Sequence, residues 1–233
     1  ITNIGESTMK NKLIFVFTTL VTILFIISFS IAIPIVIRPF YYAQIENLNL
    51  VHKTGFSKEQ IKQAYDEMLD YCLSLTDDFQ TGDLSWSESG KSHFTDVRKL
   101  FLLDLHILAL TTVLLIIYVI FKAKKNYVPY RLFGYSSMFY SGIIPVAMFT
   151  LTGVLCAIDF DRAFTVFHRI FFPGKDNWIF NHKTDEIILI LPKEFFMRCA
   201  LCILTVIVLL CTTCIIIGIC RKRAALINNR MLQ

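Results

Sequence analysis

Residues 85–121 read SWSESGKSHFTDVRKLFLLDLHILALTTVLLIIYVIF, and this stretch decides the fold class. Its second part, residues 100–121, is apolar and reaches the length of about 20 residues that a helix needs to cross a bilayer. Its first part is polar and dense in reactive side chains, namely Trp86, Glu88, His93, Asp96 and Arg98. Polar chemistry is therefore predicted where a membrane-spanning helix begins.

Three further apolar runs have the length of a membrane span, at residues 9–37, 135–158 and 199–219. The composition agrees, because 55% of the 233 residues are hydrophobic and the mean hydropathy is +0.58. We predict an all-α polytopic membrane protein with four transmembrane helices. Residues 1–8, ITNIGEST, precede a Met-Lys-Asn-Lys sequence typical of a natural N-terminus, so we interpret them as a cloning remnant.

The positive charges predict the orientation in the membrane. The connection at residues 122–134 and the tail at residues 220–233 carry basic residues and no acidic ones, which is typical of cytoplasmic segments. Both termini are therefore predicted inside the cell. Residues 38–99 and 159–198 would then lie outside and form a small extracytoplasmic subdomain. The net charge of +5 is explained by this topology and does not indicate a nucleic-acid partner.

The two outer segments have helical patterns. Ser57 followed by Gln60 predicts a capping box, and the next apolar residues recur at helical spacing: Ile61, Tyr65, Met68, Leu69 and Cys72. A second helix is predicted to begin at residues 90–92 and to continue into the second span, with His93 in its first turn. A third helix should end at Pro173 and Gly174 near the membrane surface. The pattern of residues 184–191 fits either a helix or a strand.

The first candidate site contains His93. On a helix, Asp96 lies one turn further on, so His93 could act as a general base or acid with a carboxylate to fix its tautomer. The alternative is a solvated helix start in which Asp96 only favours the helix dipole. Glu88 and Asp104 are candidate supporting residues, and Asp104 is one turn inside the span, where a carboxylate must be paired or hydrated.

The second candidate site contains His168, which shares a helix face with Asp161 and Thr165. His168 could act as a second base or acid, or it could simply pack among the surrounding aromatic residues. Arg162 and Arg169 form a parallel stripe whose simplest interpretation is binding of lipid phosphate. Trp178 and Asp185 follow in the next loop, and Asp185 is a weaker supporting candidate.

Other chemistry has little support in the sequence. The five histidines show no spacing typical of a zinc site, so no metal is predicted. Five of the seven cysteines lie in or near the last apolar run, where small buried hydrophobic residues explain them better than a redox pair or a disulfide framework. No nucleotide-binding or serine-hydrolase motif is present, and no cofactor is predicted.

Two motifs resemble a known family, the lipoprotein intramolecular transacylases (Lit) of Gram-positive bacteria. These motifs are ESGKSHFTDVRKLF at residues 88–101 and FHRIFFPGKDNWIFNHKTDEIILILPKEFF at residues 167–196. The resemblance implies four spans and a reaction at the outer face of the cell membrane. In that reaction an acyl chain moves from the diacylglyceryl group to the α-amine of the same N-terminal cysteine of a lipoprotein, which gives the lyso form without a cofactor.

The resemblance also implies roles for the candidate residues. His93 matches the reactive histidine of the family and His168 the histidine of the second motif, so both are expected to be catalytic. The expected supporting residues are Asp96, Asp104, Asp185 and Glu88, and the expected substrate-binding residues are Arg162, Arg169 and Trp178. The expected partners are the diacylglyceryl-modified lipoprotein and membrane lipids. Two alternatives stay open, a non-enzymatic four-span sensor or accessory protein and a hydrolase of lipid esters, as does the oligomeric state.

Overall fold

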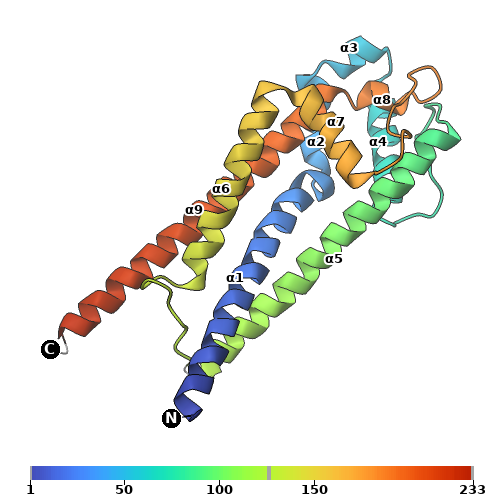
Figure 1. Ribbon diagram of the computed structural model, residues 1–233. Helices are drawn as coiled ribbons and strands as arrows, with labels where there is room; N and C mark the ends of the chain where they lie inside the picture. Colours follow the sequence, from blue (N-terminus) through green and yellow to red (C-terminus); the bar gives the residue numbers. More distant parts are fainter. Residues whose placement is uncertain (1, 125–126, 232–233) are drawn as a thin grey trace. The chain divides into compact units, whose positions relative to one another are not determined.

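A computed structural model describes residues 2–124 and 127–231 of the chain, and within these residues it contains helices and no β-strand (Figure 1). Four of the helices are long and apolar enough to cross a membrane: α1 (Thr2–Val36), α5 (Glu88–Lys124), α6 (Ser137–Ile158) and α9 (Lys193–Met231). The shorter helices are α2 (Arg38–Asn47), α3 (Leu50–Thr54), α4 (Lys58–Cys72), α7 (Phe160–Phe171) and α8 (Ile187–Ile190). The predicted all-α class with four spans is confirmed. Residues 1, 125–126 and 232–233 of the predicted remnant, inner connection and tail lie outside the described residues.

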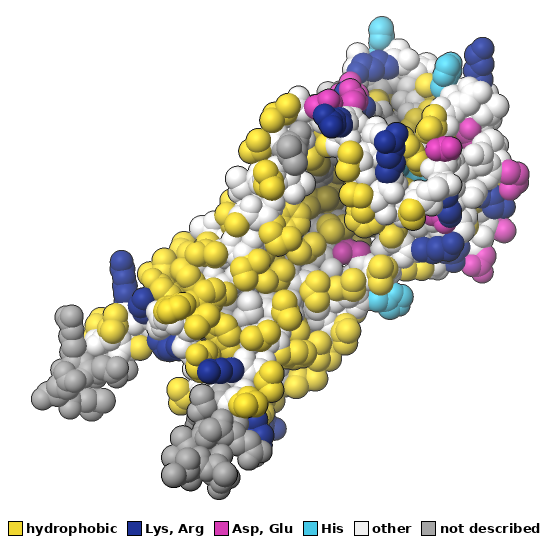
Figure 2. All heavy atoms as spheres, viewed as in Figure 1, with side chains coloured by type: hydrophobic (Ala, Val, Ile, Leu, Met, Phe, Trp, Pro, Cys, Tyr) yellow, Lys and Arg dark blue, Asp and Glu magenta, His cyan; other side chains and the backbone are white. Residues whose placement is uncertain are grey.

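The chain divides into two compact units. The first contains Ile1–Ser30, His106–Thr152 and Leu204–Gln233, and it consists mainly of membrane-type helix. Small residues bring its helices together, because a Cβ atom on Gly142 would lie 2.5 Å from the backbone oxygen of Cys211. The outward surface of such helices is apolar, and hydrophobic side chains cover most of the long helices in Figure 2.

The second unit contains Ile31–Leu105 and Gly153–Ile203 and has a core of its own. Tyr41 of α2 stacks on Tyr65 of α4 with ring centroids 3.6 Å apart, and its hydroxyl donates to the backbone oxygen of Ile190 at 2.9 Å. The capping box at Ser57 is confirmed. All five apolar residues of the predicted α4 face are buried, so the helical spacing identified the core correctly.

The start of α5 differs slightly from the prediction. The helix begins at Glu88, two residues before the predicted range, because the hydroxyl of Ser87 accepts a hydrogen bond from the Gly90 amide at 3.0 Å and caps the helix. His93 therefore lies in the second turn and not in the first. The continuation of the helix through residues 100–121 is confirmed, and α7 ends at Phe171 just before Pro173, as expected.

Residues 184–191, for which helix and strand were both open, contain the single helical turn α8. Ile187 and Ile190 of this turn are buried in the core of the second unit. The turn ends before Pro192, and α9 begins at Lys193. The second unit thereby holds the ends of α5 and α7 and the loop between α7 and α8, which carry the candidate site residues.

Candidate active site

The two candidate histidines lie together in the second unit although 75 positions separate them in the sequence. The rings of His93 on α5 and His168 on α7 are stacked, with centroids 5.9 Å apart and planes inclined by 29°. Both side chains are buried, at 6% and 7% exposure. The structure thus joins two residues that the sequence offered only as separate candidates.

Aromatic side chains enclose the pair. Phe172 lies 4.9 Å and Phe180 5.4 Å from the His93 ring, both in T-shaped arrangements, while Trp178 packs 4.7 Å from His168. All distances are between ring centroids. Such a shell removes water from the imidazoles, so it favours their neutral forms.

The surroundings determine the protonation of both rings. His93 precedes the apolar stretch of α5, and burial lowers its pKa to about 4, with a further lowering by the nearby His168. The carboxylate of Asp96 and the side chain of Asn177 oppose this shift. Burial also lowers the pKa of His168, against a smaller raising effect of its backbone hydrogen bond. Both histidines are therefore neutral at pH 7, the form in which imidazole accepts a proton.

The Nδ1 atoms of the two histidines have different partners. His168 Nδ1 lies 2.8 Å from the backbone oxygen of Phe164, and because a carbonyl only accepts, this nitrogen carries the proton. Its Nε2 is then the atom that can accept. His93 Nδ1 is buried and has no hydrogen-bond partner within residues 2–124 and 127–231. A buried nitrogen of this kind is uncommon and points to a function.

Asp96 is buried beside His93 but has other partners. Its Oδ1 accepts from Lys99 at 3.3 Å, and its Oδ2 accepts from Lys175 at 2.5 Å and from Asn177 at 3.3 Å. Burial alone would raise the pKa of Asp96, yet these three donors outweigh it and lower the pKa. The expected direct contact that fixes the His93 tautomer is not among its hydrogen bonds in the described chain. Asp96 acts on His93 through its charge.

Asp185 holds the start of α5. Its carboxylate, 3% exposed, accepts from the backbone and the hydroxyl of Ser87 at 2.8 Å each. It also leaves no room for a side chain at position 90, since a Cβ atom on Gly90 would lie 2.2 Å from Asp185 Oδ1. This carboxylate therefore fixes the helix end that carries His93.

Two of the expected supporting residues lie away from the histidine pair. Glu88 is exposed on the first turn of α5. Asp104 follows His93 by 11 positions, which corresponds to about 16 Å along a helix axis. The described geometry therefore gives neither residue a place beside the two imidazoles.

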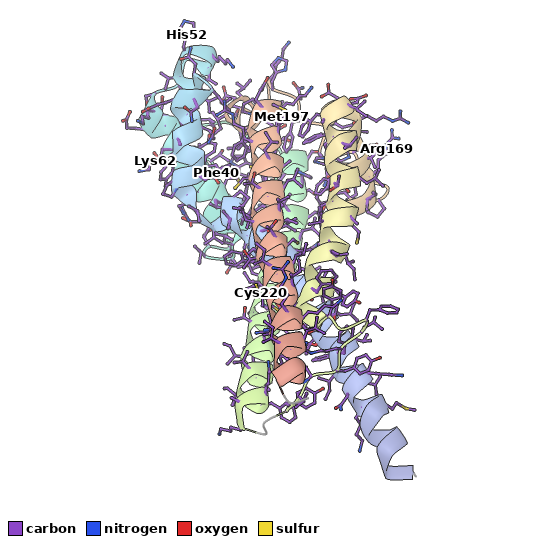
Figure 3. All side chains as sticks on the ribbon, turned by 90° about the vertical axis from the view of Figure 1, so that its left-hand side faces the viewer. Phe40, His52, Lys62, Arg169, Met197 and Cys220 are labelled. Atoms are coloured by element: carbon purple, nitrogen blue, oxygen red, sulfur yellow. The ribbon has the colours of Figure 1, made fainter. Side chains whose placement is uncertain are left out.

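A surface groove adjoins the aromatic shell. It has a volume of about 340 Å³ and is lined by Arg169, Phe172, Gly174, Lys175, Asp176, Trp178 and Ile179. Arg169, labelled in Figure 3, is exposed at its margin. Arg162 is exposed as well but is not part of the lining. Two of the three expected substrate-binding residues, Arg169 and Trp178, thus share one groove.

Sequence patterns did not indicate Asn177, Lys175 and Ser87 as site residues. Asn177 and Lys175 lie in the quoted second motif, directly after the Pro-Gly end of α7, but a polar loop residue carries no periodic signal. Within the described residues, no group of three or more His, Cys, Asp and Glu side chains could hold a metal ion. The chemistry available to the chain's own residues here is proton transfer by two neutral imidazoles in a dry aromatic setting.

Four membrane-type helices and a buried pair of neutral imidazoles define a membrane-integral protein with a site suited to proton transfer. The particular family follows from comparison with known proteins: the sequence profile of the lipoprotein intramolecular transacylase Lit matches residues 16–196, and the chain belongs to this family. The predicted family is confirmed.

Solved structures of the same kind are similar to the chain over nearly its whole length. The in meso structure of the membrane-integral lipoprotein intramolecular transacylase Lit from Bacillus cereus superimposes with a TM-score of 0.83 at 25% identity, covering 96% of this chain and 99% of the other. A structure of the Bacillus cereus protein with one histidine replaced by arginine gives a TM-score of 0.77 at 26% identity, covering 100% and 99% of the two chains. A further one, with alanine in place of a histidine, gives 0.76. No curated protein matches the chain.

Proposed function

We propose that this transacylase moves an acyl chain from the diacylglyceryl group of a lipoprotein to the α-amine of the same N-terminal cysteine. The observation that carries the proposal is the stacked pair of buried histidines, His93 and His168, both of which are neutral at pH 7. Family membership supports the reaction type, and the histidine pair supports its mechanism.

The reaction balances without a cofactor or water. The amine nitrogen attacks the ester carbonyl carbon, a C–N bond forms, and the C–O bond to the glyceryl oxygen breaks. The nitrogen loses one proton and the glyceryl oxygen gains one, so an ester and an amine become an amide and an alcohol. The enzyme has to hold the two reacting groups together and transfer that proton.

We assign the proton transfer to His93, with His168 as its assistant. An α-amine has a pKa of about 8, so roughly one molecule in ten is already neutral at pH 7 and can attack. A histidine with a pKa of about 4 is a weak base toward a free ammonium. It suits the later step, because the nitrogen of the tetrahedral adduct is far more acidic and the resulting imidazolium is a strong acid toward the leaving oxygen.

The second histidine limits the pair to one proton at a time. A positive charge on His168 lowers the pKa of His93, so the two rings resist double protonation. Their stacked arrangement supports a role for both imidazoles at one substrate position. One ring can therefore receive the amine proton while the other remains neutral to orient or accept, and Asp96 stabilises the transient positive charge.

The acyl chains of the substrate would contact the apolar surface of α7, and its polar part would bind in the groove. Four large apolar residues of α7 are exposed and suit contact with acyl chains or lipid: Val166, Phe167, Ile170 and Phe171. Arg169 and Trp178 of the groove would bind polar parts of the substrate, and Arg162 would bind a lipid phosphate. We place the site at the outer face of the cell membrane, with both termini in the cytoplasm, on the basis of the charge pattern.

The proposal is tested by mass spectrometry of the N-terminal peptide of a diacylated reporter lipoprotein, incubated in liposomes with the purified protein. We expect the S-monoacylglyceryl, N-acyl peptide at unchanged total mass, since the reaction only moves the acyl chain. Loss of one acyl chain as free fatty acid would show ester hydrolysis instead. An unchanged diacyl peptide would reject the reaction and favour a sensor or accessory role.

A further inference from the structure

The loop between α7 and α8 brings an amide, Asn177, beside the histidine pair. Its Nδ2 atom lies 3.3 Å from Asp96 Oδ2 and 3.3 Å from Ser92 Oγ. Asp96 also receives hydrogen bonds from Lys99 and Lys175, which keep it ionised. An ionised carboxylate only accepts, so the NH2 group must face Asp96, and the orientation of the amide is fixed.

With the NH2 group fixed, the carbonyl oxygen of Asn177 points elsewhere. Asn177 Oδ1 is buried and has no hydrogen-bond partner within the described ranges. His93 Nδ1 is the other buried, unpartnered side-chain atom of this site. The two side chains are neighbours, because Asn177 Nδ2 lies 3.3 Å from Ser92 Oγ and from Asp96 Oδ2, and these residues are one and three positions from His93 on α5. In agreement with this placement, the side chain of Asn177 raises the pKa of His93. A buried acceptor and a buried ring nitrogen thus lie close together, and one proton between them would satisfy both.

We propose that Asn177 is a positioning residue for the transacylation: its Oδ1 accepts the Nδ1 proton of His93, so that Nε2 is the atom that exchanges protons with the substrate. This inference rests on the proposed role of His93. It gives His93 the tautomer that His168 already has, since His168 Nδ1 donates to the backbone oxygen of Phe164. Both rings would then offer Nε2 to the same substrate.

A neutral amide suits this position better than a carboxylate. A carboxylate beside His93 would favour the imidazolium strongly and weaken it as an acid toward the leaving glyceryl oxygen. The amide fixes the tautomer with a smaller effect on the charge. The other charged or titratable groups that act on His93 are His168 on α7, Asp96 on the same helix and Lys175 on the loop.

The test uses the full chain in nanodiscs and three variants. Asn177→Ala removes the acceptor, Asn177→Asp restores an acceptor as a carboxylate, and Asn181→Ala is the matched control. Asn181 lies in the same loop and its Oδ1 accepts only a local hydrogen bond, from the Lys183 amide at 3.1 Å. The transacylation rate on the reporter lipopeptide is measured from pH 4 to pH 8 for each protein.

A second measurement does not depend on the reaction. In ¹⁵N-histidine-labelled protein, the nitrogen chemical shifts report which ring nitrogen carries the proton, and a His93→Gln sample identifies the His93 signals. We expect Nδ1–H for His93 in the wild type and in Asn181→Ala. In Asn177→Ala we expect a mixture of tautomers and a rate lowered about tenfold to a hundredfold at unchanged thermal midpoint. In Asn177→Asp we expect the Nδ1–H form, partial recovery of the rate and an acid limb moved to higher pH.

The outcomes separate the two proposals. If the wild type transacylates and Asn177→Ala has an unchanged rate and an unchanged His93 tautomer, the role of Asn177 is wrong and the proposed function stands. If the wild type fails to transacylate, the proposed function is wrong, while the nitrogen shifts still decide whether Asn177 fixes the tautomer. Should Asn177→Ala unfold, Asn177→Asp decides alone, because an unmoved acid limb in that folded variant would overturn the inference.

Discussion

The surroundings of the two histidines are determined in different ways. His168 obtains its tautomer from its own helix, through the backbone oxygen of Phe164 four residues earlier. His93 is equally buried, yet three of the four groups that act on it come from distant parts of the sequence, with Asn177 following it by 84 positions. The α7 histidine is therefore locally supported, whereas the α5 histidine depends on the tertiary structure.

The environment of His93 is therefore more sensitive to distant substitutions than that of His168. A change near His168 has to disturb α7 itself before it alters the imidazole. A change at the cap of α5 or in the loop after α7 can reach His93 without touching it, because Asp185, Ser87 and Asn177 determine its surroundings. The following experiments test that asymmetry.

The largest effect is expected from replacing the histidines. His93→Ala should lower the transacylation rate about a hundredfold to ten-thousandfold, because the proton transfer loses its acid and base. His168→Ala should also lower the rate, but by less, since His93 would remain. The rate of N-acyl peptide formation measures both. His182→Ala is the control, because this histidine is exposed in the loop and should leave the rate unchanged. A folded His93→Ala protein with the full rate would remove His93 from the mechanism.

The next effect is a loss of stability in acid. The pKa of His93 is about 4 in the folded protein, whereas the ordinary value of 6.5 applies in the unfolded chain. Between these values the unfolded chain binds a proton that the folded chain does not, so the folded state is fully stabilised above pH 6.5 and loses about 3 kcal/mol as the pH falls to 4. The pKa of Asp96 is lowered below 3.8, so its own contribution is lost only in stronger acid.

This pH dependence is measured by thermal unfolding in detergent at pH 7, 6, 5 and 4. The matched variant is His93→Phe, which keeps an aromatic ring of similar size and cannot be protonated. Its unfolding midpoint should fall less steeply between pH 6.5 and 4 than that of the wild type. Parallel curves for the two proteins would mean that His93 titrates normally and is not held neutral by its aromatic shell.

Features of the fold that depend on local sequence could be predicted. The four spans, the α4 face and the capping box at Ser57 follow from apolar length and local spacing, and the structure confirms them. His93 and His168 could be named as candidates because each shares a helical pattern with an acidic residue, and the family resemblance implied their roles. The stacking of their rings could not be predicted, because it depends on how α5 and α7 pack.

The loop residues were missed for a related physical reason. Asn177 and Lys175 each donate a hydrogen bond to Asp96, and no spacing rule relates a loop position to a helical residue 79 or 81 positions away. The same holds for the cap of α5: the start was placed two residues late because Asp185, which orients Ser87, comes from 98 positions downstream. Local patterns identified the candidate residues, and tertiary contacts decide their partners.

A smaller effect is expected at Gly90, which tests the dependence of His93 on the cap of α5. In Gly90→Ala the added Cβ atom would lie 2.2 Å from Asp185 Oδ1, so the carboxylate and the helix start must move apart. We expect a loss of about 1–3 kcal/mol of stability and a rate lowered about tenfold through misplacement of His93. Ser89→Ala, one exposed position earlier, is the control and should change neither quantity. A wild-type rate in Gly90→Ala would show that the cap does not position His93.

The smallest effect is expected at the groove, where the two arginines of α7 differ. Arg169 lines the groove beside Trp178, whereas Arg162 is exposed on the same helix and outside the lining. Arg169→Gln should raise KM for the lipopeptide severalfold at nearly constant kcat, because a contact common to the ground and transition states is lost. Arg162→Gln should leave both constants unchanged in neutral lipid. Equal effects in anionic lipid, and none in neutral lipid, would mean that both arginines bind membrane phosphate and that the groove does not hold the substrate.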